Sequence, residues 1–270
     1  MKNLFPLLLI WGLWGQSCTE AEQASQTFAR EGSFQLASPR LQADSILFSQ
    51  SANLELDMAY AGASIKYTLD GSPVTEESPL YEGPMRLEAS ALLKARAYHA
   101  SSQPSEVIQQ QFVKLPPQPA INSFALTPAP KAPYKGRGKA ALIDRQRGTV
   151  NFRAGQAWLG FQGEPLSASW RFAQPTEVSG LWLGYLVDHG AWIFGPAQVT
   201  VSSGNKILAT LNLETAQPNQ PARVAFLKLS FPAQELRQLR LEIMAPKEIP
   251  AWHPGKGTPP WLFLDEIILQ

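Results

Sequence analysis

The sequence predicts an all-β protein made of two antiparallel β-sandwiches in tandem. Short runs in which every second residue is apolar recur along the chain, and this period is typical of half-buried strands. Few stretches follow a helical period, whereas 23 prolines and 19 glycines supply many turns. After a short leader, about 250 of the 270 residues remain, enough for two cores of ~100–150 residues each.

The N-terminus carries an apolar run, residues 4–14, with Lys2 before it and Gly15-Gln16-Ser17-Cys18 after it. The run is shorter than the roughly 20 residues that cross a bilayer, so it matches a signal peptide. The Gly15-Gln16-Ser17-Cys18 segment resembles the lipobox of bacterial lipoproteins. This resemblance implies a signal over residues 1–18 and a lipid on Cys18, the only cysteine. Thr19 after the cysteine, by analogy with lipoprotein sorting, points to the outer membrane. An ordinary secretory signal with a stray cysteine is the alternative.

Composition argues against several functional classes. Residues 1–18 contain one lysine and no acidic residue, so the mature chain has 22 basic and 22 acidic side chains. It therefore has no net positive charge that would attract nucleic acid. A single cysteine allows neither an internal disulfide nor a thiolate metal cluster. The three histidines are far apart in the sequence, which gives no metal-binding spacing. The sequence also contains no G-x-S-x-G nucleophile elbow, P-loop or dinucleotide-binding fingerprint. We therefore expect a binding protein without a catalytic site.

The first sandwich is predicted over residues 34–113. Residues 19–33 before it are polar and without an apolar period, which indicates a flexible tether. Alternating runs then predict strands at residues 46–48, 52–56, 64–69 and 92–98. Asp70-Gly71 closes one of these strands as a tight turn, because glycine adopts positive φ at low cost.

A linker and a second sandwich follow. Leu115-Pro116-Pro117-Gln118-Pro119 favours an extended spacer, so residues 114–119 are predicted to link the domains. Beyond it, alternation predicts seven strands, at residues 167–172, 181–186, 198–201, 207–211, 222–226, 239–243 and 261–264. Seven strands with turns between them indicate an antiparallel sandwich over residues 120–270.

The first domain resembles a known module. Its segments 65–73, 78–81 and 92–98 (IKYTLDGSP, SPLY and LLKARAY) resemble the fibronectin-III-like module that follows the catalytic barrel of chitobiases and β-hexosaminidases. Val74 interrupts the usual order of that motif. The resemblance implies an immunoglobulin-like sandwich without catalytic residues.

The second domain resembles a discoidin-type, galactose-binding-like jelly roll of the kind found in carbohydrate-binding modules of family 32 and at the end of bacterial family-20 hexosaminidases. The matching segments are residues 141–144 with 147–149, residues 158–163, residues 192–194 with Pro196, and residues 252–255 followed by 261–267. The chain has no room for the barrel of those enzymes, so it looks like their C-terminal region carried on a lipid. Arg145 stands where the family has a glycine.

The same resemblance implies one structural Ca²⁺, held by Asp144, Thr149 and Glu266, since oxygen ligands suit this ion. The alternative is that Asp144 caps a turn and Glu266 is solvated. The neighbouring Asp265-Glu266 pair could suggest glycoside hydrolysis. Adjacent side chains on a regular strand point to opposite faces, however, so we expect no catalysis from this pair.

Aromatic residues in loops carry the functional prediction. A sugar ring stacks its C–H face on an indole while its hydroxyls need polar groups nearby. Loops with this mixture contain the predicted sugar-binding residues, namely His189, Trp192, Trp252, His253, Arg153 and Trp158. Trp170 and Trp182 lie inside alternating runs and are predicted to be core. Core packing is also the alternative for Trp158 and Trp192.

The sequence thus predicts a non-catalytic, membrane-anchored lipoprotein that binds a glycan, with N-acetylhexosamine or galactose as the sugar type. We expect a monomer that binds no nucleic acid and has a glycosidase as a partner. Two alternatives remain open. The sandwiches can instead dock to a partner enzyme or envelope assembly without binding sugar, or the chain can be a hydrolase whose acid-base pair the sequence does not reveal.

Overall fold

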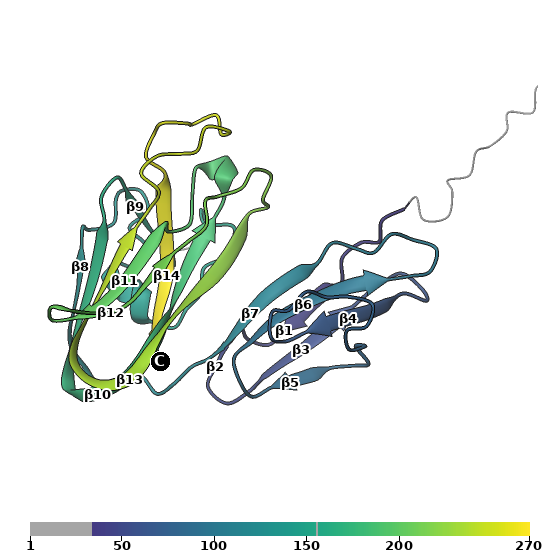
Figure 1. The fold of residues 1–270 in the computed structure, drawn as a ribbon, viewed down its shortest axis with the longest axis horizontal. Coiled ribbons are helices and arrows are strands. Elements are labelled where there is room, and N and C mark those ends of the chain that lie inside the picture. Colours follow the sequence, from purple (N-terminus) through teal and green to yellow (C-terminus); the bar gives the residue numbers. More distant parts are fainter. Residues whose placement is uncertain (1–33, 155) are drawn as a thin grey trace, which may run out of the picture.

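The computed structural model describes residues 34–154 and 156–270, and there the chain is nearly all β (Figure 1). The predicted all-β class with antiparallel sheets is confirmed. The predicted signal, Cys18 and the tether lie outside the described residues. In the described part, no helix is long and apolar enough to span a membrane.

Two facing sheets form the first sandwich. One sheet has the order β1 (Arg40–Ala43), β3 (Ala52–Asp57), β5 (Met85–Leu87). The other has the order β2 (Leu47–Phe48), β7 (Ile108–Lys114), β6 (Ala91–Tyr98), β4 (Ser64–Thr68). Period two determines which residues enter the core: along β3, Ala52, Leu54 and Leu56 are buried and the residues between them are exposed.

The second sandwich contains seven strands and two short 3-10 turns. The strands are β8 (Ile121–Thr127), β9 (Leu159–Gln162), β10 (Leu166–Val187), β11 (Gln198–Ser203), β12 (Lys206–Asn212), β13 (Arg223–Met244) and β14 (Trp261–Leu269). The turns are η1 (Lys139–Ile143) and η2 (His189–Ala191). Trp170, predicted to be core, is 1% exposed within the main apolar cluster.

Two strands of 22 residues, β10 and β13, run through both layers of this sandwich. They pair with each other along almost their whole length, with register shifts between Arg171 and Thr176 and between Val178 and Gly180. Such irregularities let a strand pair bend from one layer into the other. The first half of β10 lies beside β8, and its second half lies beside β14. Runs that the sequence predicts as four separate strands are therefore joined into two.

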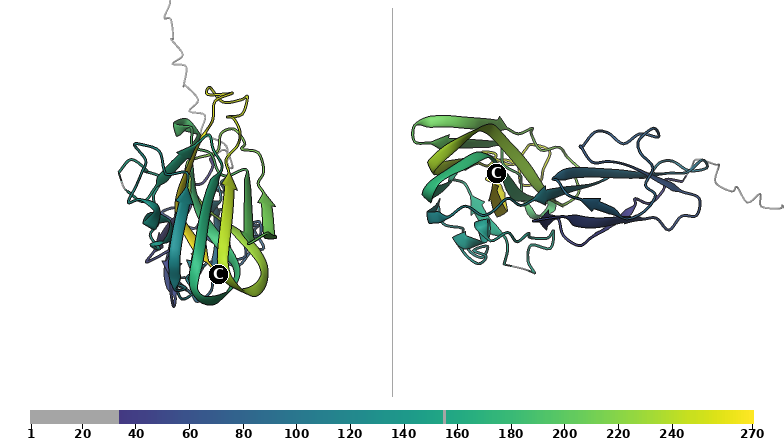
Figure 2. Two further views of the ribbon diagram at one scale, coloured as in Figure 1. Left: turned by 90° about the vertical axis from the view of Figure 1, so that its left-hand side faces the viewer. Right: turned by 90° about the horizontal axis from the view of Figure 1, so that it is seen from below.

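The two sandwiches meet at one end of the second (Figures 1 and 2). Trp182 and Ile268, on the outer face of the second sandwich, form an apolar cluster with Val113 at the end of β7. Leu47, Leu115 and Phe226 pack against that cluster. The linker is also held by hydrogen bonds, since Arg145 donates to the Pro116 carbonyl at 2.6 Å and Gln118 donates to that of Ile143 at 3.2 Å. Trp182 is thus buried, as predicted, but between the domains instead of inside one.

Candidate functional site

A tight turn after β10 shapes the other end of the second sandwich. Asp188 caps η2 by accepting a hydrogen bond from the Ala191 amide at 3.1 Å. Trp192 ends the turn with φ of 62°, a left-handed conformation that non-glycine residues rarely adopt. The turn thus holds the Trp192 side chain outward, with 44% of the residue exposed.

A second loop, residues 250–258, packs on this turn through His253. The Nδ1 atom of His253 accepts a hydrogen bond from the Gly255 amide at 3.0 Å, so Nε2 carries the proton and donates to the His189 carbonyl at 2.8 Å. Gly255 brings its backbone against the Trp192 indole, because a Cβ atom there would lie 3.1 Å from the ring. His253 is 7% exposed and both its ring nitrogens are occupied. It therefore holds the two loops together and offers no free nitrogen to a ligand.

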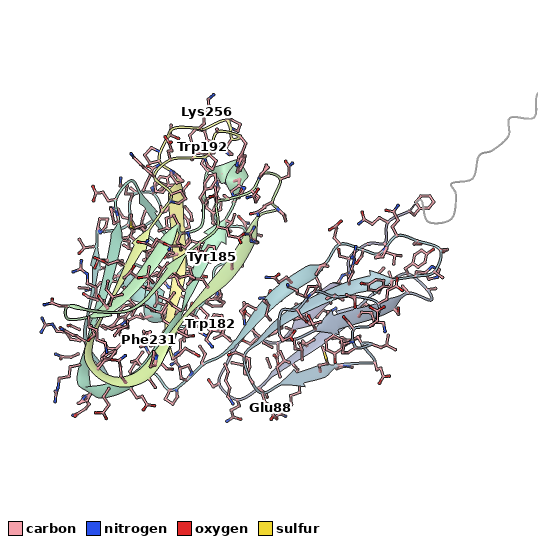
Figure 3. The ribbon with its side chains drawn as sticks, viewed as in Figure 1. Glu88, Trp182, Tyr185, Trp192, Phe231 and Lys256 are labelled. Carbon is pink, nitrogen blue, oxygen red and sulfur yellow. The ribbon has the colours of Figure 1, made fainter. Side chains whose placement is uncertain are left out.

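Two exposed tryptophans, which we call the tryptophan pair, flank His253. Trp192 and Trp252 are 44% and 39% exposed, and their ring centroids lie 6.1 and 5.5 Å from that of His253. Figure 3 shows Trp192 and Lys256 together at the opposite end of the sandwich from Trp182. The two loops that the sequence predicts to bind sugar thus lie side by side.

A recess of about 500 Å³ opens beside the tryptophan pair. We call it the aromatic recess, and its lining includes Tyr185, His189, Phe194, Arg223 and Glu248. The His189 ring stacks on Phe194, with centroids 4.5 Å apart, and meets Trp252 edge-on at 5.2 Å. A volume of this size is within the range of small-molecule sites and suits one or two sugar residues.

His189 is the most unusual group in the aromatic recess. The residue is 7% exposed, yet neither ring nitrogen has a hydrogen-bond partner among the described residues. Most buried polar atoms have a partner, so this ring has unused capacity to donate and accept. Burial, and then the charge of Arg223, lower the pKa of His189, which keeps the ring neutral.

Arg223 and Tyr185 supply further polar groups to the recess. Arg223 is exposed, and in the described part of the chain its guanidinium contacts no carboxylate; one nitrogen donates to Gln220 at 3.0 Å. Burial raises the pKa of the Tyr185 hydroxyl, which therefore keeps its proton. With Glu248 as acceptor, the recess presents donors and acceptors beside aromatic faces, an arrangement that suits hydroxyl-rich ligands.

Arg153 and Trp158 lie elsewhere. Trp158 is 3% exposed, and its indole nitrogen donates to the Thr149 carbonyl at 2.9 Å, so it packs in the interior and does not form an exposed platform. The Arg153 guanidinium lies 4.3 Å from the centre of the Phe152 ring. Both residues line a separate recess of about 390 Å³.

The structure brings together two of the residues predicted to hold calcium. Asp144 and Glu266 are neighbours, since both accept from the Gln146 amide, at 3.0 and 3.1 Å. The Arg137 guanidinium, however, lies 2.5 Å from the Asp144 carboxylate and supplies a positive charge there. Within residues 34–154 and 156–270 no three His, Cys, Asp or Glu side chains gather to hold a metal. Calcium binding itself stays a prediction that chelation tests.

The expectation that Asp265 and Glu266 face opposite sides holds for a regular strand, and β14 is irregular there because it bulges. Gly184 pairs with Glu266 while Tyr185 pairs with Leu264, so Asp265 is the extra residue. Both carboxylates therefore reach the loop at residues 144–148: Asp265 pairs with Arg147 at 2.7 Å and accepts from Gly148 at 2.8 Å.

Burial dominates the electrostatics of this acidic pair. It raises the pKa of Asp265 to about 6, against the charge of Arg147. Burial first, and then the charges of Asp144 and Asp265, raise the pKa of Glu266 to about 8. Both residues are 0% exposed, so neither carboxylate is open to a substrate in this arrangement.

Sequence reasoning missed Tyr185, Arg223 and Glu248. Tyr185 and Arg223 belong to alternating runs that read as ordinary strands, and Glu248 lies in a proline-flanked loop. Arg223 is the first residue of β13 and follows the long loop that connects β12 to β13. Only the pairing of Arg223 with Val187 across β10 and β13 shows that it lies beside the η2 turn.

Comparison with known protein families agrees with the first module. Residues 44–109 match the chitobiase/β-hexosaminidase C-terminal domain, and this segment lies within the predicted first sandwich. The predicted module type is therefore supported for this part of the chain. Among curated proteins, none matches the sequence.

Solved structures similar to this chain include carbohydrate-binding modules. A pectin-binding module is 13% identical with a TM-score of 0.32, covering 57% of this chain and 92% of its own. The family-32 module of AlyQ, in complex with 4,5-unsaturated mannuronic acid, is 12% identical with a TM-score of 0.31, covering 57% and 97%. A chitosan-binding module from a Paenibacillus sp. IK-5 chitosanase/glucanase is 11% identical with a TM-score of 0.32, covering 56% and 96%. Similarity at this level carries no conclusion about the ligand.

Proposed function

We propose that this protein binds a glycan without cleaving it, at the aromatic recess and the tryptophan pair. The observation that carries the proposal is His189, a buried ring with two unpartnered nitrogens in a recess that Arg223 and Glu248 also line. These nitrogens are covered in this arrangement, so a sugar hydroxyl reaches them after a side chain of the lining moves, whereas the exposed Arg223 and Glu248 can bind hydroxyls as they are placed. Trp252 beside His189 offers an apolar face. A neutral hexose, of the galactose or N-acetylhexosamine type, matches a mixture of one cation, two carboxylates and neutral donors.

The site contains no feature of an acid-base pair acting on a glycosidic bond. Glu248 and Glu214 line the recess, but both are exposed to solvent and neither is held in an apolar pocket of the kind that suits a general acid. The interaction-protein alternative stays open, and it requires no sugar in the recess. Sugar binding therefore decides between the two.

The sharpest test is His189→Phe, which keeps the stacking on Phe194 and removes the ring nitrogens. Calorimetric titration of the full-length chain with methyl galactoside and N-acetylglucosamine oligosaccharides should give a dissociation constant of about 0.1–1 mM. The variant should bind about tenfold more weakly, because one or two hydrogen bonds are lost. His99→Phe in the first sandwich is the matched control and should leave binding unchanged. If His189→Phe binds like the parent, the recess is not the site; if the parent binds no sugar of a broad panel, the interaction-protein alternative replaces this proposal.

We also propose that the sandwiches are carried on a lipid at Cys18, in the outer membrane. The support is the Gly15-Gln16-Ser17-Cys18 join after a short apolar run. Lipoproteins carry two or three acyl chains, enough for stable anchoring where one chain is marginal. Cys18→Ala should move the protein from the membrane fraction to the soluble fraction, and full retention in the membrane would contradict the lipobox interpretation.

A further inference from the structure

Positive charge is concentrated in one segment of the second sandwich. The chain as a whole is nearly neutral, with 23 basic and 22 acidic side chains. Residues 131–153 nevertheless contain seven basic residues and one acid, Asp144. The basic residues are Lys131, Lys135, Arg137, Lys139, Arg145, Arg147 and Arg153.

Four of these cations already have protein partners. Arg137 pairs with Asp144, and Arg147 pairs with Asp265. Arg145 donates to Pro116, and Lys139 donates to the Phe124 carbonyl at 2.7 Å. The other three, Lys131, Lys135 and Arg153, are exposed and make no ion pair in the part of the chain that the structure describes.

Two of those three cations line one concave surface, which we call the basic recess. Its volume is about 390 Å³, and its lining includes Tyr134, Lys135, Phe152, Arg153, Gln156 and Trp158. Among the described residues, no Asp or Glu side chain lines it. The stacking of Arg153 on Phe152, 4.3 Å from the ring centre, orients the guanidinium and limits the entropy lost when it binds. The recess therefore presents two cations, an amide and an aromatic floor to one ligand group.

The basic recess connects to the proposed sugar site through Trp261. The Tyr134 ring lies edge-on to Trp261 with centroids 5.2 Å apart. The Trp261 amide in turn donates to the Trp192 carbonyl at 2.9 Å. Trp192 belongs to the tryptophan pair, so contacts through Tyr134, Trp261 and Trp192 link the basic recess to the tryptophan pair.

We infer that the basic recess binds the carboxylate or sulfate group of an acidic sugar residue, in the same glycan chain whose neutral residue occupies the aromatic recess. This inference rests on the proposed function and adds the ligand class: an acidic polysaccharide. Paired cations bind such anions through short, charge-assisted hydrogen bonds. The concave, monosaccharide-sized shape favours a sugar over a membrane surface, which is bound by larger clusters of four to eight exposed cations.

The test is a comparison of matched trisaccharides on the full-length chain. A galacturonic acid trisaccharide should bind about tenfold more tightly than its methyl ester, and a sulfated galactose trisaccharide about tenfold more tightly than the unsulfated one, which is about 1.4 kcal/mol. Raising NaCl from about 0.05 M to about 0.5 M should remove most of this preference, because the cations are exposed. The double variant Lys135→Gln/Arg153→Gln should lose the preference and still bind methyl galactoside. Lys114→Gln/Arg86→Gln, in the first sandwich, is the control and should retain it.

The outcomes separate the two proposals. If the parent binds neutral and acidic trisaccharides equally, or if the double variant keeps the preference, the basic recess does not bind acidic sugars and the proposed function stands. If the parent binds neither, the proposed function fails as well. If the Cys18→Ala protein binds phosphatidylglycerol vesicles, loses that binding in the double variant, and binds none of the acidic trisaccharides, the basic recess is a lipid contact and the inference is overturned.

Discussion

At the end of the second sandwich that meets the first, Arg147 and Trp182 are buried against Asp265 and Phe226. At the opposite end, Arg223 is exposed and has no carboxylate partner among the residues that the structure describes, and Trp192 projects outward. The space at each end differs accordingly. A cavity of about 20 Å³, room for about one water, lies beside the linker, whereas the aromatic recess has about 500 Å³. The same residue types therefore serve assembly at one end and are available to a ligand at the other.

Whether a polar group has a partner and whether space adjoins it must be considered together. Trp182 also has an indole nitrogen without a partner, yet it lies between two packed domains where no ligand can enter. The unpartnered nitrogens of His189 lie in a recess. An unpartnered polar atom thus indicates a binding site only where space for a ligand adjoins it.

The largest expected effect at the joint is that of Arg147→Gln. The variant leaves the Asp265 carboxylate fully buried without its ion-pair partner, so the free energy of unfolding should fall by about 3–5 kcal/mol. Urea denaturation followed by tryptophan fluorescence measures the loss. Arg147→Met/Asp265→Leu, which removes both charges, should recover part of it. If Arg147→Gln unfolds like the parent, the ion pair does not stabilise this end of the sandwich.

Trp182→Ala should have the next largest effect, about 3 kcal/mol on the free energy of unfolding, because it opens a cavity among Val113, Ile268 and Phe226. Since the cluster joins the two sandwiches, the variant should also separate one unfolding transition into two. Scanning calorimetry of the full-length chain shows this directly. A single transition at the parent's temperature would mean that the joint contributes little.

Trp252→Ala at the open end should act on binding and hardly on stability. Trp252 is 39% exposed, so its loss should change the free energy of unfolding by less than about 1 kcal/mol. Loss of a stacking face worth about 1–1.5 kcal/mol should weaken sugar binding about tenfold. The opposite pattern, with stability lost and affinity kept, would place Trp252 with Trp182 as a packing residue.

Much of the fold could be predicted from the sequence, because strand period and turn residues are local signals. The alternation of β3 and β6 and the tryptophan-containing loops around Trp192 and Trp252 are examples. The bend that joins two runs into β10 could not be predicted, since bulges depend on the partner strand. The bulge at Asp265 likewise overturned a rule that holds for regular strands only.

The site was predicted in part, for the same reason. Trp192 and Trp252 carry a compositional signal, an aromatic residue next to glycine, proline and histidine. His253 carries the same signal, but both its ring nitrogens already form hydrogen bonds, with Gly255 and His189, and the sequence does not show these contacts. Arg223 gives no local signal, because it reaches the recess through pairing between distant strands. Residue types can be read from the sequence, whereas the partners that occupy them depend on the fold.

The smallest expected effect is that of chelation. It tests whether the second sandwich needs a bound metal ion beside Asp144 for its stability. The family resemblance predicts that EDTA lowers the melting temperature, because a bound ion in hundredfold excess over its dissociation constant would add about 2.7 kcal/mol of stability. The placement of Arg137 on Asp144 predicts almost no change, since the guanidinium already supplies the positive charge. We expect the second result, a shift below about 1 °C, in contrast to the roughly 5–10 °C that such a stabilisation implies. Arg137→Gln should restore a need for calcium, so its melting temperature should rise when calcium is added and fall with EDTA. A drop of several degrees in the parent with EDTA, reversed by calcium, would show that the ion binds beside Arg137.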